Sequence, residues 1–203
     1  MTLLTFPPAV FIGYGQMEGG FPAFARQVSA VSTQIIGFSF AVNTAVIVLL
    51  QFAVLRLIRG HRRTRVMQIM TLTWALSWGG VLGLTGLLPA SLAAAIGVLL
   101  FMGVFAFGET MLQPTVPAIY NDLATDRSRG GRYNAINAAA FQGGAIAGPI
   151  AAGLLLGEGG RQAWFIVAMI LGACSSACSP LRWSAGFRPR PTGSRLRSRR
   201  RAR

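Results

Sequence analysis

Long apolar runs separated by short polar segments follow one another along the chain, and this pattern predicts membrane-spanning helices. The clearest run, residues 134–157, contains no charged residue. As a helix it would cover roughly 36 Å, more than the hydrocarbon core of a bilayer requires. The other predicted spans are residues 1–17, 33–58, 66–88, 91–119 and 163–181. We therefore expect an all-α polytopic bundle of about six transmembrane helices within residues 1–181.

The ends of these spans carry their own signals. Residues 1–17 are at the lower limit of length for a crossing, so we expect the first helix to be incomplete. Residues 15–30 contain several glycines and Pro22, which predict a loop. In the fourth span, Pro114 and Pro117 predict a bend or an end of the helix.

Composition agrees with a membrane location, because 53% of the 203 residues are hydrophobic and only 12% are charged. The net charge of +14 comes entirely from arginine. The arginines form clusters between the apolar runs and in residues 182–203, which argues against a nucleic-acid partner. Arg26 and Arg161 alone lie in the loops expected outside, so the positive-inside rule predicts a multi-pass protein of the cell membrane with both termini in the cytoplasm.

Few residues are suited to catalysis or metal binding. His61 is the one histidine, and the five acidic residues are scattered along the chain. Cys174 and Cys178 are four residues apart in an apolar run, which is typical of small buried thiols. We expect no enzyme activity, no metal site and no cofactor.

Polar residues inside or near the spans are the candidates for a translocation path. Glu109 is the foremost, because an ionisable group within a span is costly unless it faces protein or a water-filled cavity; a structural salt bridge or a helix-end interaction is the alternative. The other candidates are Asn43, Asn137, Gln142, Gln16 and Glu18. The amides either bind substrate or join helices. Gln16 and Glu18 either line an external vestibule or are solvated loop residues.

The fifth span contains a G-x-x-x-G-P motif formed by Gly144, Gly148 and Pro149, with Gly153 further along. Small residues at this spacing predict close packing against another helix, and the proline predicts a bend. Asn137, Phe141, Gly144 and Gly148 fall on one helical face. That face is expected to meet a specific partner helix.

Residues 182–203 are rich in arginine, proline, serine and glycine, so we expect a disordered basic cytoplasmic tail. The run RLRSRRRAR favours binding to anionic lipid headgroups over nucleic acid. The abrupt change of composition near Ala173 also suggests an altered reading frame.

The arrangement of spans and two motifs resemble the carboxyl-terminal half of a bacterial, drug-efflux-like transporter of the major facilitator superfamily. The basic loop RLIRGHRR is similar to the family's G-x-x-x-D-R-x-G-R-R loop at Gly60, Arg62 and Arg63, with Arg59 beside them, but it lacks the acid. The fifth span is similar to the family's G-x-x-x-G-P-x-x-G-G helix, with Ala152 in place of a glycine.

The resemblance implies a membrane secondary transporter, half-length or truncated, which exports a small amphipathic molecule in exchange for protons. Its partners would be the bilayer, an unidentified small-molecule substrate, and a second copy or a separate amino-terminal half. The alternative is a non-transporting remnant or membrane-anchored interaction protein from a split or frameshifted gene.

Overall fold

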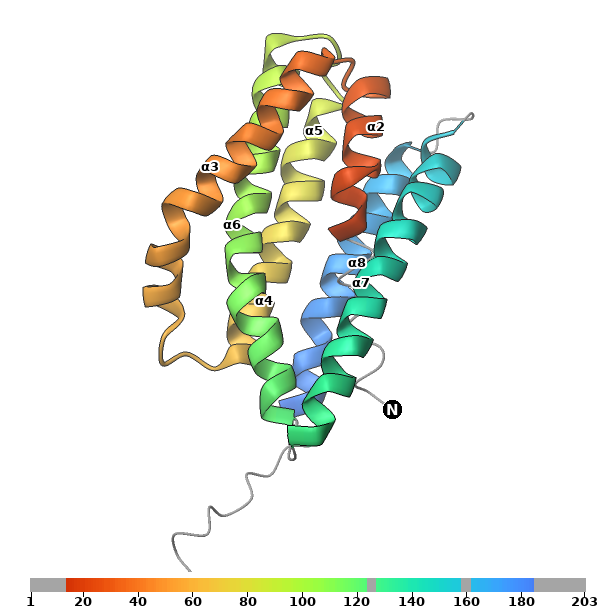
Figure 1. The fold of residues 1–203 in the computed structure, drawn as a ribbon. Helices are drawn as coiled ribbons and strands as arrows, with labels where there is room; N and C mark the ends of the chain where they lie inside the picture. Colours follow the sequence, from red (N-terminus) through yellow and green to blue (C-terminus); the bar gives the residue numbers. More distant parts are fainter. Residues whose placement is uncertain (1–13, 124–126, 158–161, 185–203) are drawn as a thin grey trace, which may run out of the picture.

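In a computed structural model of the chain, residues 14–123, 127–157 and 162–184 are described, and they are helical apart from short connections (Figure 1). Residues 14–18, here called segment 14–18, lead into α2 (Gly20–Gln27). The remaining helices are α3 (Thr33–Ile58), α4 (Arg63–Ala75), the π-helix η1 (Leu76–Leu82), α5 (Gly83–Thr85), α6 (Leu92–Leu123), α7 (Arg127–Leu156) and α8 (Gln162–Ser184). The expected all-α fold is confirmed, with no strand in these residues.

Successive helices run up and down the bundle, with α3 beside α6 and α2 beside α7 (Figure 1). Three segments are long and apolar enough to cross a membrane, namely Thr33–Ile58, Leu92–Ala118 and Ala138–Leu156. Large apolar side chains cover the outside of the bundle, among them Phe38, Leu49, Ile146 and Leu171. Such a surface suits lipid and would be unfavourable in water.

The loop expected at residues 15–30 is wrong, because this stretch is helical up to Gln27 and contributes to the core. The side chains of Phe21 and Phe24 are buried, and Pro22 is the third residue of α2. Proline is tolerated in the first turn of a helix, where its missing N–H would have no partner within the helix. The glycines that suggest a loop instead permit close packing.

Other helix limits also differ from the expected ones. Pro114 and Pro117 do not end α6, which continues to Leu123, and α7 begins at Arg127 rather than at residue 134. Each proline removes one backbone hydrogen bond, but the helix around them is held by the buried side chains of Thr115 and Val116. The predicted start at residues 1–13 and the tail beyond residue 184 lie outside the described residues.

Aromatic rings fill the centre of the bundle. Phe101 of α6 stacks on Phe21 with a centroid distance of 4.8 Å and meets Trp78 edge-on, also at 4.8 Å. Trp74 lies flat on Phe105 at 4.9 Å, and its indole N–H donates to the Phe105 carbonyl at 3.1 Å. These contacts fasten α4 and η1 to α6, so that α6 forms part of a rigid scaffold.

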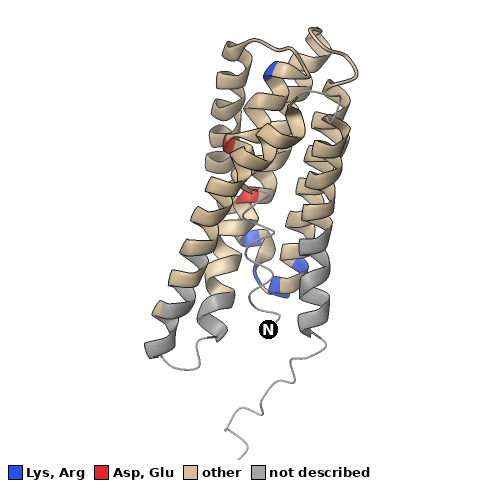
Figure 2. Cartoon of the chain, turned by 90° about the vertical axis from the view of Figure 1, so that its right-hand side faces the viewer, with Lys and Arg blue, Asp and Glu red and all other residues tan. Residues whose placement is uncertain are grey.

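Charged residues are segregated along the bundle axis. Arg26 precedes α3, whereas Arg59, Arg62 and Arg63 follow it, so the two groups lie at opposite ends of that helix. Figure 2 shows most of the described basic residues at one end and the acidic residues between the ends. We call the end with the loop after α3 the arginine-rich end.

The fit of α4 against α6 can be tested at Gly108. A Cβ added there would lie 2.6 Å from two atoms of the Trp74 indole, which cannot move easily because it is stacked and hydrogen-bonded. We expect Gly108→Ala to lower the free energy of unfolding by about 1–3 kcal/mol. The control Gly37→Ala, at a glycine of α3 with open space around it, should leave thermal unfolding in detergent unchanged or slightly improved. Equal melting temperatures for the two variants would contradict this packing.

Candidate functional site

The carboxylate of Glu109 lies deep in the bundle. Glu109 is 17 residues after the first residue of α6 and 14 before the last, which places it about 20–25 Å along the helix from either end. Its side chain is only 7% exposed. A carboxylate at this depth needs hydrogen-bond donors from neighbouring helices, because neither water nor lipid headgroups surround it.

Two neutral side chains supply these donors. The Tyr14 hydroxyl donates to Oε1 of Glu109 at 2.6 Å, and the Asn43 amide donates to Oε2 at 3.2 Å. Each carboxylate oxygen thus has one partner, one from segment 14–18 and one from α3. Among the described residues, no basic side chain forms an ion pair with Glu109. The amide of Asn43 joins α3 to α6.

Aromatic rings enclose Tyr14 on three sides. Its ring centroid is 5.3 Å from that of Phe141 on α7, 6.2 Å from that of Trp74 on α4 and 6.3 Å from that of Phe105 on α6. The hydroxyl is thereby aimed at Glu109 by rings from three helices. Together, these four rings and the carboxylate form a mostly apolar site with one acidic group, which we call the Glu109 site.

Segment 14–18 packs tightly on the G-x-x-x-G-P motif of α7. A Cβ on Gly148 would lie 2.9 Å from the carbonyl carbon of Gly15, and one on Gly19 would lie 2.8 Å from the ring of Pro149. Gln16 is fully buried, and its amide donates to the Gly148 carbonyl at 2.7 Å. Gln16 is therefore neither a vestibule residue nor a solvated loop residue, because it joins two helices.

The remaining polar candidates lie elsewhere. Glu18 and Gln142 are exposed, and the side chain of Asn137 lies outside the described residues. Of the face expected on α7, Phe141, Gly144 and Gly148 lie against segment 14–18. Gly153 faces open space within the described part of the chain, so the packed groove does not reach it.

The basic loop contacts α6 across the bundle. Arg63, the first residue of α4, donates to the Ala118 carbonyl near the end of α6 at 2.5 Å. Arg59 and Arg62 are exposed. Gly60 has φ +81°, a left-handed conformation that favours glycine and turns the chain out of α3. The loop thus holds α6 through a backbone carbonyl, without the acid that the resembled motif contains.

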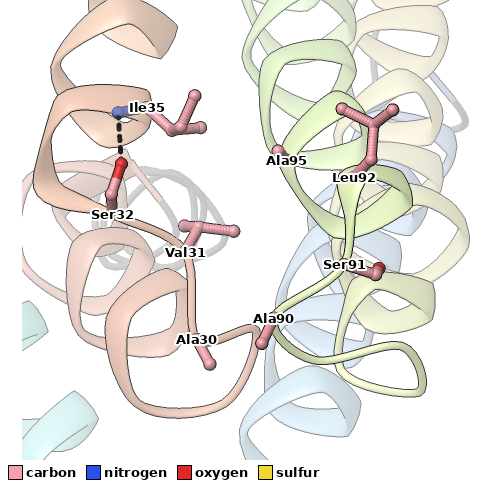
Figure 3. Close-up of a pocket in the computed structure, with 8 residues that line it drawn as sticks. All are labelled: Ala30, Val31, Ser32, Ile35, Ala90, Ser91, Leu92 and Ala95. Carbon is pink, nitrogen blue, oxygen red and sulfur yellow. Dashed lines mark hydrogen bonds between the residues drawn. The ribbon is translucent and has the colours of Figure 1, made fainter.

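A separate pocket of about 270 Å³ lies between the loops before α3 and before α6, at the opposite end from the arginine-rich end (Figure 3). Its eight lining residues are Ala30, Val31, Ser32, Ile35, Ala90, Ser91, Leu92 and Ala95. The hydroxyls of Ser32 and Ser91 accept hydrogen bonds from the N–H groups of Ile35 and Ala94, as helix caps. These hydroxyls are engaged by the chain itself, which makes the pocket a weaker candidate than the Glu109 site.

The family model of the Major Facilitator Superfamily matches residues 7–203. The chain belongs to the Major Facilitator Superfamily. Among curated proteins and among solved structures, nothing matches the chain. Membership identifies a multi-pass membrane transporter of the superfamily type, and members of this superfamily are transporters rather than enzymes.

The sequence of this superfamily member does not single out Tyr14, although Tyr14 is a central residue of the Glu109 site. It lies in a glycine-containing stretch that suggests a loop, and its partner Glu109 is 95 positions away. The one available signal is a hydroxyl group in an otherwise apolar run. Trp74 is missed for a similar reason, because a tryptophan in a span is most simply a packing residue.

Tyr14 should contribute measurably to stability. We expect Tyr14→Phe to lower the free energy of unfolding by about 1.5–3 kcal/mol, because the buried carboxylate loses one of its two donors while the ring is kept. The matched control is Thr44→Val, which removes an exposed hydroxyl bonded only within its own helix. Thermal unfolding of the full chain in detergent compares the two; an unchanged Tyr14→Phe melting temperature would show that this hydrogen bond is dispensable.

Proposed function

We propose that the protein exports a small amphipathic molecule across the cell membrane in exchange for protons, with Glu109 as the proton-binding group. The observation that carries the proposal is a buried carboxylate, deep in α6, whose two partners are neutral donors. A carboxylate that is fixed by a nearby arginine stays ionised. Among the described residues, Glu109 is held by Tyr14 and Asn43, and neither partner carries a charge.

Protonation would change how the helices hold this group. The ionised carboxylate accepts hydrogen bonds from segment 14–18 and from α3 at the same time. A protonated carboxyl is neutral, accepts more weakly and carries a donor of its own, so the attraction between these helices and α6 falls. Proton binding then favours one arrangement of the bundle and proton release another, which is the requirement for coupling.

The surroundings of Glu109 suit an amphipathic substrate. The rings of Tyr14, Phe141, Trp74 and Phe105 make the surroundings of this single acidic group apolar. Such a combination would accept a molecule with an apolar body and one polar end. The Asn43 amide adds a group that recognises a polar end once the carboxylate is protonated.

The segregation of arginines supports an orientation for transport. We place the arginine-rich end in the cytoplasm by the positive-inside rule, with both termini on that side. In α7, Pro149 interrupts the hydrogen-bond ladder beside the close contact with Gly19, and we assign the flexing of the helix to the Gly148–Pro149 step.

A vesicle assay tests the role of Glu109. In proteoliposomes that contain the full chain, an imposed proton gradient should drive accumulation of ethidium, chosen as an amphipathic probe. Glu109→Gln keeps the size and one carbonyl oxygen that accepts a hydrogen bond, but its amide nitrogen cannot accept the second one and the side chain cannot ionise, so accumulation should fall to the level of protein-free vesicles. Gln142→Glu, an exposed site on α7, is the matched control and should behave like the wild type. Gradient-driven accumulation that survives Glu109→Gln would remove the coupling role.

A second six-helix unit would complete the path. The Glu109 site is bordered by α3 and α7, whose outer faces carry exposed apolar side chains such as Leu49 and Leu154, exposed by 75% and 69%. These faces are suited to contact with another bundle as well as with lipid. We propose that this unit is a second copy or a separate amino-terminal half.

Light scattering of the purified protein in detergent tests whether the second unit is another copy of this chain. We expect a protein mass of about twice the 21.6 kDa of one chain. A charged replacement on the outer face of α7, Leu154→Arg, should return the mass to that of one chain, whereas Leu57→Arg, near the end of α3, serves as a control. A single-chain mass for the wild type would exclude the second copy and leave a separate half as the partner.

A further inference from the structure

We propose that four arginines at the arginine-rich end form a binding site for the headgroup of an anionic phospholipid. They are Arg56, Arg59, Arg62 and Arg65, which we call the arginine patch. The site goes beyond the proposed transport function and does not depend on it. It requires that α3 crosses the membrane, which the 26-residue length and the apolarity of this helix allow.

A closed turn after α3 holds two members of the patch. The His61 N–H donates to the Ile58 carbonyl at 3.1 Å, which closes a turn of four residues. Arg59 has φ −58° and ψ 130°, and Gly60 has φ +81°. These angles are typical of a type II turn, which favours glycine at its third position. Arg62 follows directly in an extended conformation and leads into α4. The backbone thus fixes where the arginine side chains start.

The guanidinium groups of the patch are exposed, and none has a hydrogen-bond or ion-pair partner among the described side chains and backbone groups. Arg63 differs from them, because it donates to the Ala118 carbonyl. The described acidic residues lie between the ends of the bundle and not beside the patch (Figure 2). Four like charges within ten residues repel one another. An anion bound among them would lower this repulsion.

The type of side chain indicates phosphate as the anion. A guanidinium group is planar and can donate two parallel hydrogen bonds to a phosphate group. Clusters of four or more basic residues directly beside a transmembrane helix are typical of sites for anionic lipids. The positive-inside rule accounts for an excess of arginine on one side of the membrane. It does not require that the arginines surround a closed turn.

An exposed apolar surface next to the patch favours a phospholipid over a soluble phosphate. Phe52, Arg56 and Arg59 follow the spacing i, i+4, i+7, so they lie along one side of the end of α3. The side chain of Phe52 is 66% exposed, and that of Leu57 is 63% exposed. A lipid whose phosphate meets Arg56 and Arg59 would place its acyl chains beside Phe52. A soluble phosphate would leave this apolar surface uncovered.

Native mass spectrometry of the full chain with added lipid tests the site. Phosphatidylglycerol is the anionic probe, and phosphatidylcholine carries the same phosphate without a net charge. In ~0.2 M ammonium acetate, diffuse attraction between exposed charges is largely screened. The wild type should therefore retain phosphatidylglycerol in preference to phosphatidylcholine. Arg59→Gln combined with Arg62→Gln should lower the affinity for phosphatidylglycerol about tenfold and leave that for phosphatidylcholine unchanged.

Two further variants complete the design. Arg56→Gln combined with Arg65→Gln changes the patch on the two helices and not in the connection between them. It should weaken the binding of phosphatidylglycerol likewise, and it carries the test if the first variant loses its helical circular dichroism. The matched control is Arg197→Gln combined with Arg199→Gln, which removes the same charge from residues 182–203. This control should bind phosphatidylglycerol like the wild type.

Three outcomes would overturn the inference. The first is equal retention of the two lipids by the wild type. The second is an equal loss of affinity in the patch variants and in the control, because the attraction would then depend on overall charge. The third is that glycerol 1-phosphate, which lacks acyl chains, binds as tightly as phosphatidylglycerol. In that case the site would hold a soluble phosphate and not a lipid.

Discussion

The burial of one carboxylate deep in a membrane bundle sets requirements that several parts of the structure meet. Glu109 needs a donor for each oxygen, and Tyr14 and Asn43 provide them from two other helices. Both donors are neutral, and no basic side chain among the described residues forms an ion pair with Glu109. A merely structural role would be served better by an apolar side chain, because the desolvation of a charge is costly. An ionisable group at this position is the observation on which the proposal of proton-coupled transport rests.

Two kinds of packing divide the bundle around this carboxylate. On one side, α4 and η1 are fastened to α6 by stacked rings and by donors to its carbonyls, with Trp74 and Ser77 bonded to Phe105 and Phe101. On the other side, segment 14–18 meets α7 through glycines and a single amide. The first contact is broad and aromatic, whereas the second is narrow and contains an unsatisfied oxygen. The two contacts therefore differ in the size of their side chains and in how fully their polar groups are paired.

The glycines at and before the start of α2 suggest a loop in the sequence, but in the bundle they allow close packing of helices. Gly15, Gly19 and Gly20 suggest a loop when they are read one at a time, since glycine weakens helices in water. Within the bundle Gly15 and Gly20 are helical and Gly19 is the cap before α2, and the space they leave is occupied by Gly144, Pro149 and the Phe165 ring. In a membrane, small residues allow helices to pack closely. Backbone N–H and C=O groups without hydrogen-bond partners are costly there, so the chain stays helical. The same reasoning explains why α6 continues through Pro114 and Pro117.

Hydropathy alone determined the class of the fold and the main helices, because length and apolarity decide whether a helix can cross a bilayer. The sequence also singled out Glu109 and the G-x-x-x-G-P motif as candidates. The segregation of arginines was likewise visible in the sequence. Only the tertiary structure decided which groups meet, since Tyr14 and Glu109 are 95 positions apart and Gln16 and Gly148 are 132 apart. No local pattern encodes such distant pairs. They arise from the way in which the helices pack, and that packing depends on every side chain in the interface at once.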